Sequence, residues 1–171
     1  METETLTSLT DGYRPGVEEG PPLRSYAVFS GIWAAGLAGA LAAARRSGRQ
    51  PPQVTAADVL LVGTASHKLS RLVTKDKVTA FVRAPFTEYE GPGGPAEVEE
   101  RPRGTGVRRA LGELLVCPYC LGLWMASALE LGLIFAPRVT RLIASTFSAL
   151  TISDFLQIAY KAAEGRGLQS S

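Results

Sequence analysis

Four long apolar runs follow one another along this chain, and polar or charged segments separate them. The runs cover residues 26–44, 54–73, 118–135 and 140–160. A helix rises about 1.5 Å per residue, so about twenty apolar residues cross the roughly 30 Å hydrocarbon layer of a bilayer. The pattern predicts an all-α fold, a polytopic membrane helix bundle of about four transmembrane helices plus a flexible polar loop.

The first run, residues 26–44, contains no charged side chain. Gly31, Ala35, Gly39 and Ala43 recur every four residues and give the predicted helix a small-residue face for close helix packing. A cleaved signal peptide is the alternative, since ALAAA resembles a processing site. The preceding segment is acidic, however, whereas a signal peptide starts with a short basic segment. A spanning helix is therefore favoured.

The second run, residues 54–73, is apolar only in its first half, because His67, Lys68 and Arg71 lie in the second. Thr55 and Asp58 have the spacing of a capping box at a helix start. Long basic side chains near a helix end extend toward water, which makes a crossing feasible. We predict a fourth spanning helix here. The alternative is a helix that lies on the membrane surface.

Pro118 divides the third run, because proline ends a helix but fits the first turn of the next one. We expect a short helix to about Val116 and a spanning helix from Pro118. Residues 87–107 are rich in proline, glycine and acids without periodicity, so they predict a flexible polar loop. Residues 1–25 predict a disordered acidic tail, and residues 161–171 predict a polar tail.

The distribution of charge predicts the orientation in the membrane. The net charge is only +2, and no basic stripe alternates with aromatic residues, which argues against nucleic acid as a partner. With four crossings, one side carries Arg45, Arg46, Arg49, Arg138 and Arg141, and the other side carries the remaining Lys and Arg residues. The positive-inside rule then predicts a multi-pass protein of the cell (plasma) membrane, with both termini and the long loop in the cytoplasm.

Cys117 and Cys120 are the two cysteines and form the sequence Cys-Pro-Tyr-Cys. The positive end of a helix dipole favours the thiolate needed for disulfide exchange, so the first hypothesis is a redox pair resembling a glutaredoxin site. No βαβ frame for that motif is present. The second hypothesis is half of a zinc site, which a dimer would complete. The third is packing as small apolar residues, which the usual burial of cysteine favours.

Asp154 is an acid inside the fourth run, where a charge is costly and indicates a function or a partner. It lies about 21 Å from the start of that run, toward the predicted cytoplasmic side. We hypothesise that Asp154 is a proton partner of the thiols within a polar cluster near the inner leaflet. The cluster would contain Cys117, Cys120, Asp154, His67 and Arg71, with Asp76 and Arg83 close to it. The alternative is a structural ion pair between Asp154 and Arg71.

Two motifs carry a family resemblance: SRLVTKDKVTAFVRAPF at residues 70–86 and LGELLVCPYCLGLW at residues 111–124. Together they resemble the small bacterial membrane proteins catalogued as a domain of unknown function, which include sporulation-associated YjcA-like proteins. The shared patterns are R-L-x-x-x-D-K-x-T-x-x-x-R-x-P-F and G-E-L-L-x-C-x-x-C-x-G-x-W. The resemblance covers residues 54–160 and implies a helical membrane domain with an acid in its last helix, but no established activity. The helix at residues 26–44 is additional.

These observations lead to one main functional hypothesis, a membrane interaction or assembly component without enzymatic activity. Its partners would be the lipid bilayer and a membrane or cytoplasmic protein that binds residues 84–107, and a homo-oligomer is an open alternative. The second hypothesis is a thiol–disulfide oxidoreductase in which Cys117 attacks and Cys120 resolves, although cytoplasmic thiols stay reduced. The third is a dimeric metal-binding protein. No cofactor is indicated, since no glycine-rich phosphate loop follows a strand.

Overall fold

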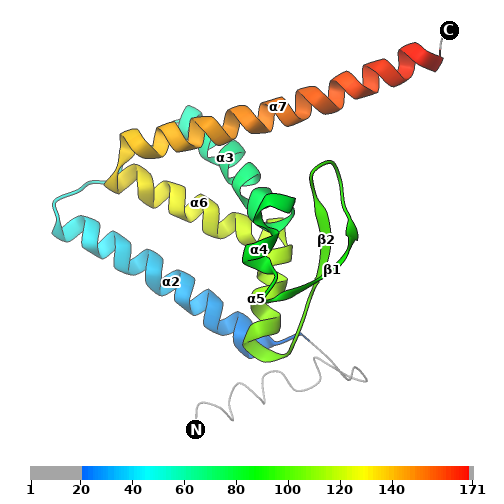
Figure 1. The fold of residues 1–171 in the computed structure, drawn as a ribbon. Helices are drawn as coiled ribbons and strands as arrows, with labels where there is room; N and C mark the ends of the chain where they lie inside the picture. Colours follow the sequence, from blue (N-terminus) through cyan, green and yellow to red (C-terminus); the bar gives the residue numbers. More distant parts are fainter. Residues whose placement is uncertain (1–20, 170–171) are drawn as a thin grey trace.

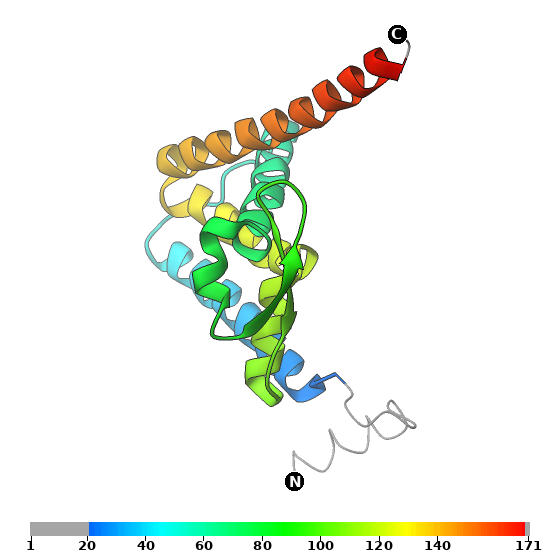
Figure 2. The ribbon, with the colours of Figure 1, turned by 45° about the vertical axis from the view of Figure 1, so that its right-hand side comes forward.

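The computed structural model of the chain describes residues 21–169 and is mostly helical (Figures 1 and 2). Most of the predicted acidic tail therefore lies outside the described residues. The elements are α2 (Leu23–Arg46), α3 (Ala56–Thr74), the short 3-10 helix η1 (Lys77–Thr79), α4 (Ala80–Arg83), β1 (Thr87–Pro92), β2 (Val98–Pro102), α5 (Gly106–Val116), α6 (Pro118–Phe135) and α7 (Pro137–Gln169).

Within the described residues, three helices are long and apolar enough to cross a membrane: α2, α6 and the Pro137–Gly165 part of α7. Four such helices were predicted, and α3 does not qualify because charged side chains interrupt its apolar run. The predicted polar tail is also different, since α7 continues as a helix past Tyr160. In both views its carboxyl-terminal half projects away from the other helices (Figures 1 and 2).

The helix ends follow the local sequence as predicted. Thr55 accepts a hydrogen bond from the Asp58 backbone N–H over 3.2 Å, and the Asp58 carboxylate accepts one from the Thr55 N–H over 3.2 Å. This capping box starts α3. Pro118 is the first residue of α6, and Cys117 separates it from α5. The predicted break of the third run is therefore confirmed.

The core lies where α3 packs against α6 and α7. Its buried residues are Val62, Ala65, Leu129, Leu133 and Ala144. Hydroxyl groups of α7 reach the backbone of α3: Ser148 donates to the Leu61 carbonyl and Thr151 donates to the Thr64 carbonyl, each over 3.0 Å. Small and hydroxyl-bearing residues at such interfaces are typical of helices that pack in a membrane.

α2 lies beside α6 and runs in the same direction (Figure 1). The Trp33 indole N–H donates to the Ser127 hydroxyl of α6 over 3.0 Å. Beyond the end of α2, the Arg49 guanidinium donates to the Phe135 carbonyl and lies 5.7 Å from the centre of the Phe135 ring. Two contacts in the same chain order on both helices establish this parallel arrangement.

Residues 87–107 form an antiparallel hairpin and the start of α5, so the predicted flexible loop is wrong for this segment. Thr87 pairs with Pro102 and Pro92 pairs with Val98, and the register shifts between Tyr89 and Gly91. Val98 is the buried apolar residue of the strands. Because the strands lack the alternation of apolar and polar residues that marks a half-buried strand, the pattern gave no strand signal.

The hairpin is attached to the chain that leaves α3. The Lys77 N–H donates to the Ala96 carbonyl over 2.9 Å, and the Val98 N–H donates to the Lys75 carbonyl over 3.0 Å. Through these two hydrogen bonds, the segment after α3 pairs with the chain at the start of β2. Contacts with distant residues, rather than local propensity, order this part of the chain.

Gly112 lets α5 approach the hairpin closely, and Gly112→Ala tests this packing. A Cβ atom there would lie 2.5 Å from the Phe86 carbonyl oxygen and 3.0 Å from the Pro102 Cβ. We expect the variant to lose about 1–3 kcal/mol of unfolding free energy, the usual cost of overpacking. The measurement is thermal unfolding in detergent, followed by tryptophan fluorescence.

The control is Gly122→Ala on α6, where an added Cβ meets nothing within 4 Å. This change should leave stability the same or raise it, because alanine favours helix more than glycine does. Equal unfolding temperatures for the two variants would contradict the proposed close approach.

Candidate functional site

Three ion pairs join the region of α3 and α4 to the acidic strand β2 and its preceding turn. In each pair a cation that follows the middle of α3 meets a glutamate of residues 97–100, which were expected to be part of a flexible loop. The pairs are Arg71 with Glu97, Lys75 with Glu99 and Arg83 with Glu100. Arg71 and Arg83 were predicted site residues, whereas the glutamates were not.

Arg83 is the centre of this arrangement, because its side chain is fully buried. Its Nε donates to the Glu100 carboxylate, and its Nη1 donates to the Val73 carbonyl over 2.6 Å and to the Thr79 hydroxyl over 2.9 Å. Its Nη2 donates to the Asp76 carbonyl over 3.1 Å. One guanidinium therefore connects the end of α3, η1, α4 and β2.

Asp76 lies at the same junction, and its carboxylate is 4.0 Å from the Lys68 ammonium. Burial raises the pKa of the Asp76 carboxyl above its usual value. The charge of Lys68 acts against this rise, while the charges of Glu97 and Asp154 add to it. The folded protein thus disfavours the charged form of Asp76.

Asp154 binds Lys68 rather than Arg71: its carboxylate lies 2.8 Å from the Lys68 ammonium. The alternative of an Asp154–Arg71 pair is therefore wrong. His67 lies beside α7 as well, with its ring stacked on Phe155 at a centroid distance of 6.3 Å. These contacts join α3 to α7 and involve neither cysteine.

Cys117 and Cys120 form a close sulfur pair at the junction of α5 and α6, with Cα atoms 5.3 Å apart. Cys117 also caps α6, since its sulfur accepts a hydrogen bond from the Cys120 N–H over 3.1 Å. Tyr119 between them is 92% exposed. Among residues 21–165, no hydrogen bond or ion pair joins either sulfur to the charged junction of α3. Asp154 binds Lys68 instead, so no direct bond joins it to the cysteines in the described residues.

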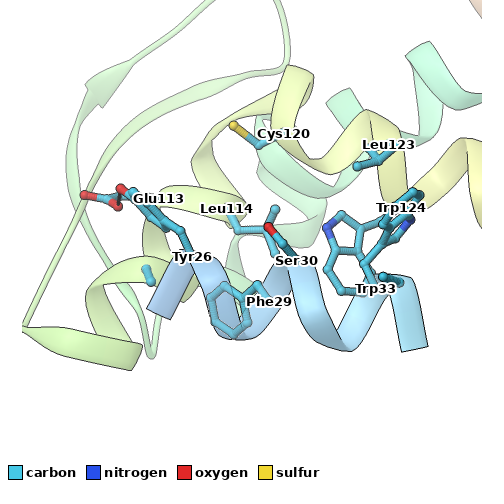
Figure 3. A pocket seen from close by; sticks show the side chains of 11 residues that line it. Tyr26, Phe29, Ser30, Trp33, Glu113, Leu114, Cys120, Leu123 and Trp124 are labelled. Atoms are coloured by element: carbon cyan, nitrogen blue, oxygen red, sulfur yellow. Dashed lines mark hydrogen bonds between the residues drawn. The ribbon is translucent and has the colours of Figure 1, made fainter. Parts of the chain in front are cut away.

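Cys120 contributes to a cleft of about 560 Å³ between α2, α5 and α6 (Figure 3). The wall is mainly aromatic and aliphatic. Its residues are Tyr26, Phe29, Ser30, Trp33, Ala34, Ala110, Glu113, Leu114, Cys120, Leu123 and Trp124. Figure 3 shows Trp33 and Trp124 at one end and Tyr26 with Glu113 at the other. The cleft depends on how α2 lies against α6, which no local pattern reveals.

The described residues contain no cluster of side chains that would support a metal site. Among the described residues, no group of three or more His, Cys, Asp and Glu residues gathers where it could hold an ion. A zinc ion needs about four ligands, and the sulfur pair supplies two. Completion of the site would require a second chain, as the sequence also indicated.

Comparison with known proteins gives a family and two relatives. The profile of a family described as "Protein of unknown function (DUF1360)" matches residues 61–160. The UPF0713 protein YngL of Bacillus subtilis (strain 168) is 32% identical over 78 residues, which are 44% of this chain and 56% of that protein. The sporulation protein YjcA of the same organism is 37% identical over 76 residues, 43% of this chain and 64% of that protein.

Each match thus spans less than two thirds of the relative's own length. No solved structure matches the chain.

Arg83→Met tests the junction, because it leaves Glu100 buried without its charge partner. Removal of one partner of a buried ion pair typically costs about 3–5 kcal/mol. We expect the hairpin to open, so that trypsin cleaves at Arg101 and Arg103 much faster than in the unchanged protein. The measurement is the rate of limited proteolysis in detergent, with cleavage sites identified by mass spectrometry.

Two further variants make this test specific. Glu88→Gln breaks an exposed pair with Arg101 while keeping both cleavage sites, and it should cost at most about 1 kcal/mol. The double variant Arg83→Met with Glu100→Met should recover much of the resistance, because no unpaired charge stays buried. Unchanged proteolysis of the Arg83→Met variant would contradict a central role for this side chain.

Proposed function

Because the chain belongs to the DUF1360 family of proteins of unknown function, we propose that it is a membrane interaction or assembly component. Residues 75–102, which we name the platform, would present one fixed surface to a partner protein beside the apolar helices. The three apolar helices would hold this platform at the membrane. The observation that carries the proposal is the buried hydrogen-bonded guanidinium of Arg83.

A buried ion pair supports specificity more than stability. Removing two charges from water costs free energy that their attraction only partly offsets, so such pairs add little to folding. The Arg83–Glu100 pair instead favours one geometry of the platform over others, because a shifted hairpin would leave a charge buried and unpaired. A surface ordered in advance loses less conformational entropy on binding, which suits a recognition role.

Exposed apolar side chains on η1 and α4 support the same proposal. Val78 is 72% exposed, Phe81 is 76% exposed and Val82 is 44% exposed. Apolar side chains gathered on one short stretch and rimmed by charge are typical of interaction surfaces. Arg101 and Glu88 supply exposed charges of both signs on the strands. The partner surface should therefore be apolar with a charged border.

We place the platform and both termini in the cytoplasm, with α3 as a fourth crossing helix in the plasma membrane. The uneven distribution of Lys and Arg supports this orientation. Arg141 binds Asp58 near the starts of α7 and α3, and Asp154 binds Lys68 further along both helices. The two helices therefore run side by side in the same direction. Coverage by α6 and α7 would shield the polar side chains of α3 from lipid.

Similarity to a protein named for sporulation supports placing the partner in that process. The similarity covers 43% of this chain, so the argument applies to the shared segment. α2 lies outside the residues that the family profile matches.

Photo-crosslinking in living cells of the natural host tests the interaction. A photoreactive amino acid at position 81 should give one discrete crosslinked product, because Phe81 lies on the proposed surface. The matched control is position 48, which follows α2 at the far end of the helices. The same product should be lost when Arg83→Met is introduced. Products of equal yield from both positions, or none from position 81, would refute the proposal.

A thiol–disulfide oxidoreductase is the second candidate, and the close sulfur pair favours it. In this reaction a Cys117 thiolate attacks a disulfide of a substrate, which releases one substrate thiolate. Cys120 then attacks the mixed disulfide, so the pair is oxidised and the substrate is reduced to two thiols. The exposed Tyr119 beside the pair would offer an apolar contact for a substrate.

Thiol titration of the purified protein, with and without a chelator, distinguishes the three hypotheses for the cysteines: a redox pair, a metal site and packing. A redox pair should equilibrate with glutathione buffers and react rapidly after reduction, and Cys120→Ser should trap a mixed disulfide at Cys117. Thiols released only by the chelator would instead indicate metal. Thiols that react slowly and respond to neither treatment would indicate that the cysteines serve only in packing.

A further inference from the structure

We propose that the cleft between α2, α5 and α6 binds one phospholipid of the surrounding bilayer. An acyl chain would lie along the aromatic wall, and the head group would lie at the end formed by Tyr26 and Glu113 (Figure 3). This site is separate from the platform and needs no chemistry at the cysteines. The proposed lipid site therefore does not depend on the proposed function, and either can be correct without the other.

The wall of the cleft has the polarity gradient of an amphiphile. At one end the Tyr26 hydroxyl donates to the Glu113 carboxylate, and the Arg109 Nε donates to the same carboxylate over 3.1 Å. At the other end Trp33, Trp124 and neighbouring apolar side chains form the wall. A head group fits the first end and a hydrocarbon chain fits the second, whereas a wholly polar or wholly apolar ligand matches only one of them.

The position of the cleft along α2 agrees with a lipid that enters from the bilayer. Tyr26 lies near the start of this helix, where tyrosine commonly sits at the membrane interface. Trp33 follows seven residues later, which is about 10 Å deeper along a helix that crosses the membrane. The cleft thus runs from the head-group region into the hydrocarbon layer, and a longer acyl chain continues beyond it.

α2 leaves this space because it packs loosely on the other helices. Ser25 and Ala44 are its buried residues, and both lie near its ends. The cleft volume is within the range of about 300–1,000 Å³ that small-molecule sites have. Empty apolar space forfeits dispersion contacts, and water gains few hydrogen bonds in it. A hydrocarbon chain is the occupant that a bilayer supplies at this depth.

The charges at the mouth favour a phospholipid over a free fatty acid. Arg109 and Glu113 place a cation and an anion side by side, joined by a hydrogen bond. The carboxylate of a fatty acid would meet the negative charge of Glu113, while a phospholipid would place its uncharged glycerol esters there and its phosphate outside the cleft. The head group therefore reaches the polar end without placing its charge inside the cleft.

Lipid retention by the purified full-length protein tests the site. After exchange into detergent and size-exclusion chromatography, native mass spectrometry should find about one phospholipid per chain. Ala34 is exposed and lines the cleft, so Ala34→Phe should fill the space and lower this occupancy about tenfold, or 1.4 kcal/mol in binding. The matched control is Ala35→Phe, an exposed neighbour on α2 outside the cleft, which should retain the lipid.

A second measurement uses the two tryptophans at the apolar end of the cleft. Phospholipid brominated on its acyl chain is added to delipidated protein, and quenching should saturate at about one lipid per chain. This titration decides the matter if the Ala34→Phe variant aggregates. Equal retention by both variants, retention of fatty acid or detergent alone, or quenching that never saturates would overturn the proposal.

Discussion

The pairing of cations from the α3–α4 region with the glutamates of residues 97–100 is the constraint on which the shape of the polar part depends. Arg83 matters most, because it is fully buried and bonds to four partners that range from Val73 in α3 to Glu100 in β2. A buried guanidinium tolerates few alternative geometries, since each lost partner leaves a desolvated donor. This requirement fixes the hairpin against the end of α3, and α5 then packs on β2 through Gly112.

Sequence patterns predicted the helices well and the hairpin not at all, and the reason lies in the range of the forces. The runs that became α2 and α6 are continuous, and Pro118 marks a helix start through its own covalent geometry. The hairpin instead depends on ion pairs between residues 71–83 and 97–100. From the local sequence alone, those glutamates are typical of an acidic loop. The Gly-Gly-Pro turn between acidic segments was nevertheless an available signal for a hairpin.

The partners of the charged side chains on α3 do not follow from their depth along the helix, because residues at similar depth need not face the same neighbour. Lys68 and Arg71 are three positions apart on α3, yet Lys68 meets Asp154 of α7 and Arg71 meets Glu97 beside the hairpin. The sequence identified which side chains need partners in an apolar helix, since an isolated charge there is costly. It did not identify which neighbour each one meets, because that choice depends on the direction in which α3 and α7 run together.

The surroundings of Cys120 combine the segment that the family profile matches with a helix outside it. Cys120 lies on α6, within the residues that the family profile matches, while Phe29 and Trp33 of the cleft wall come from α2, outside them. Without α2 this face of α6 would be an open surface rather than the side of an aromatic cleft. The chemistry available at Cys120 therefore depends on a helix that the matched segment does not contain. The neighbours of Cys120 therefore include side chains from two parts of the chain, of which the family profile matches one.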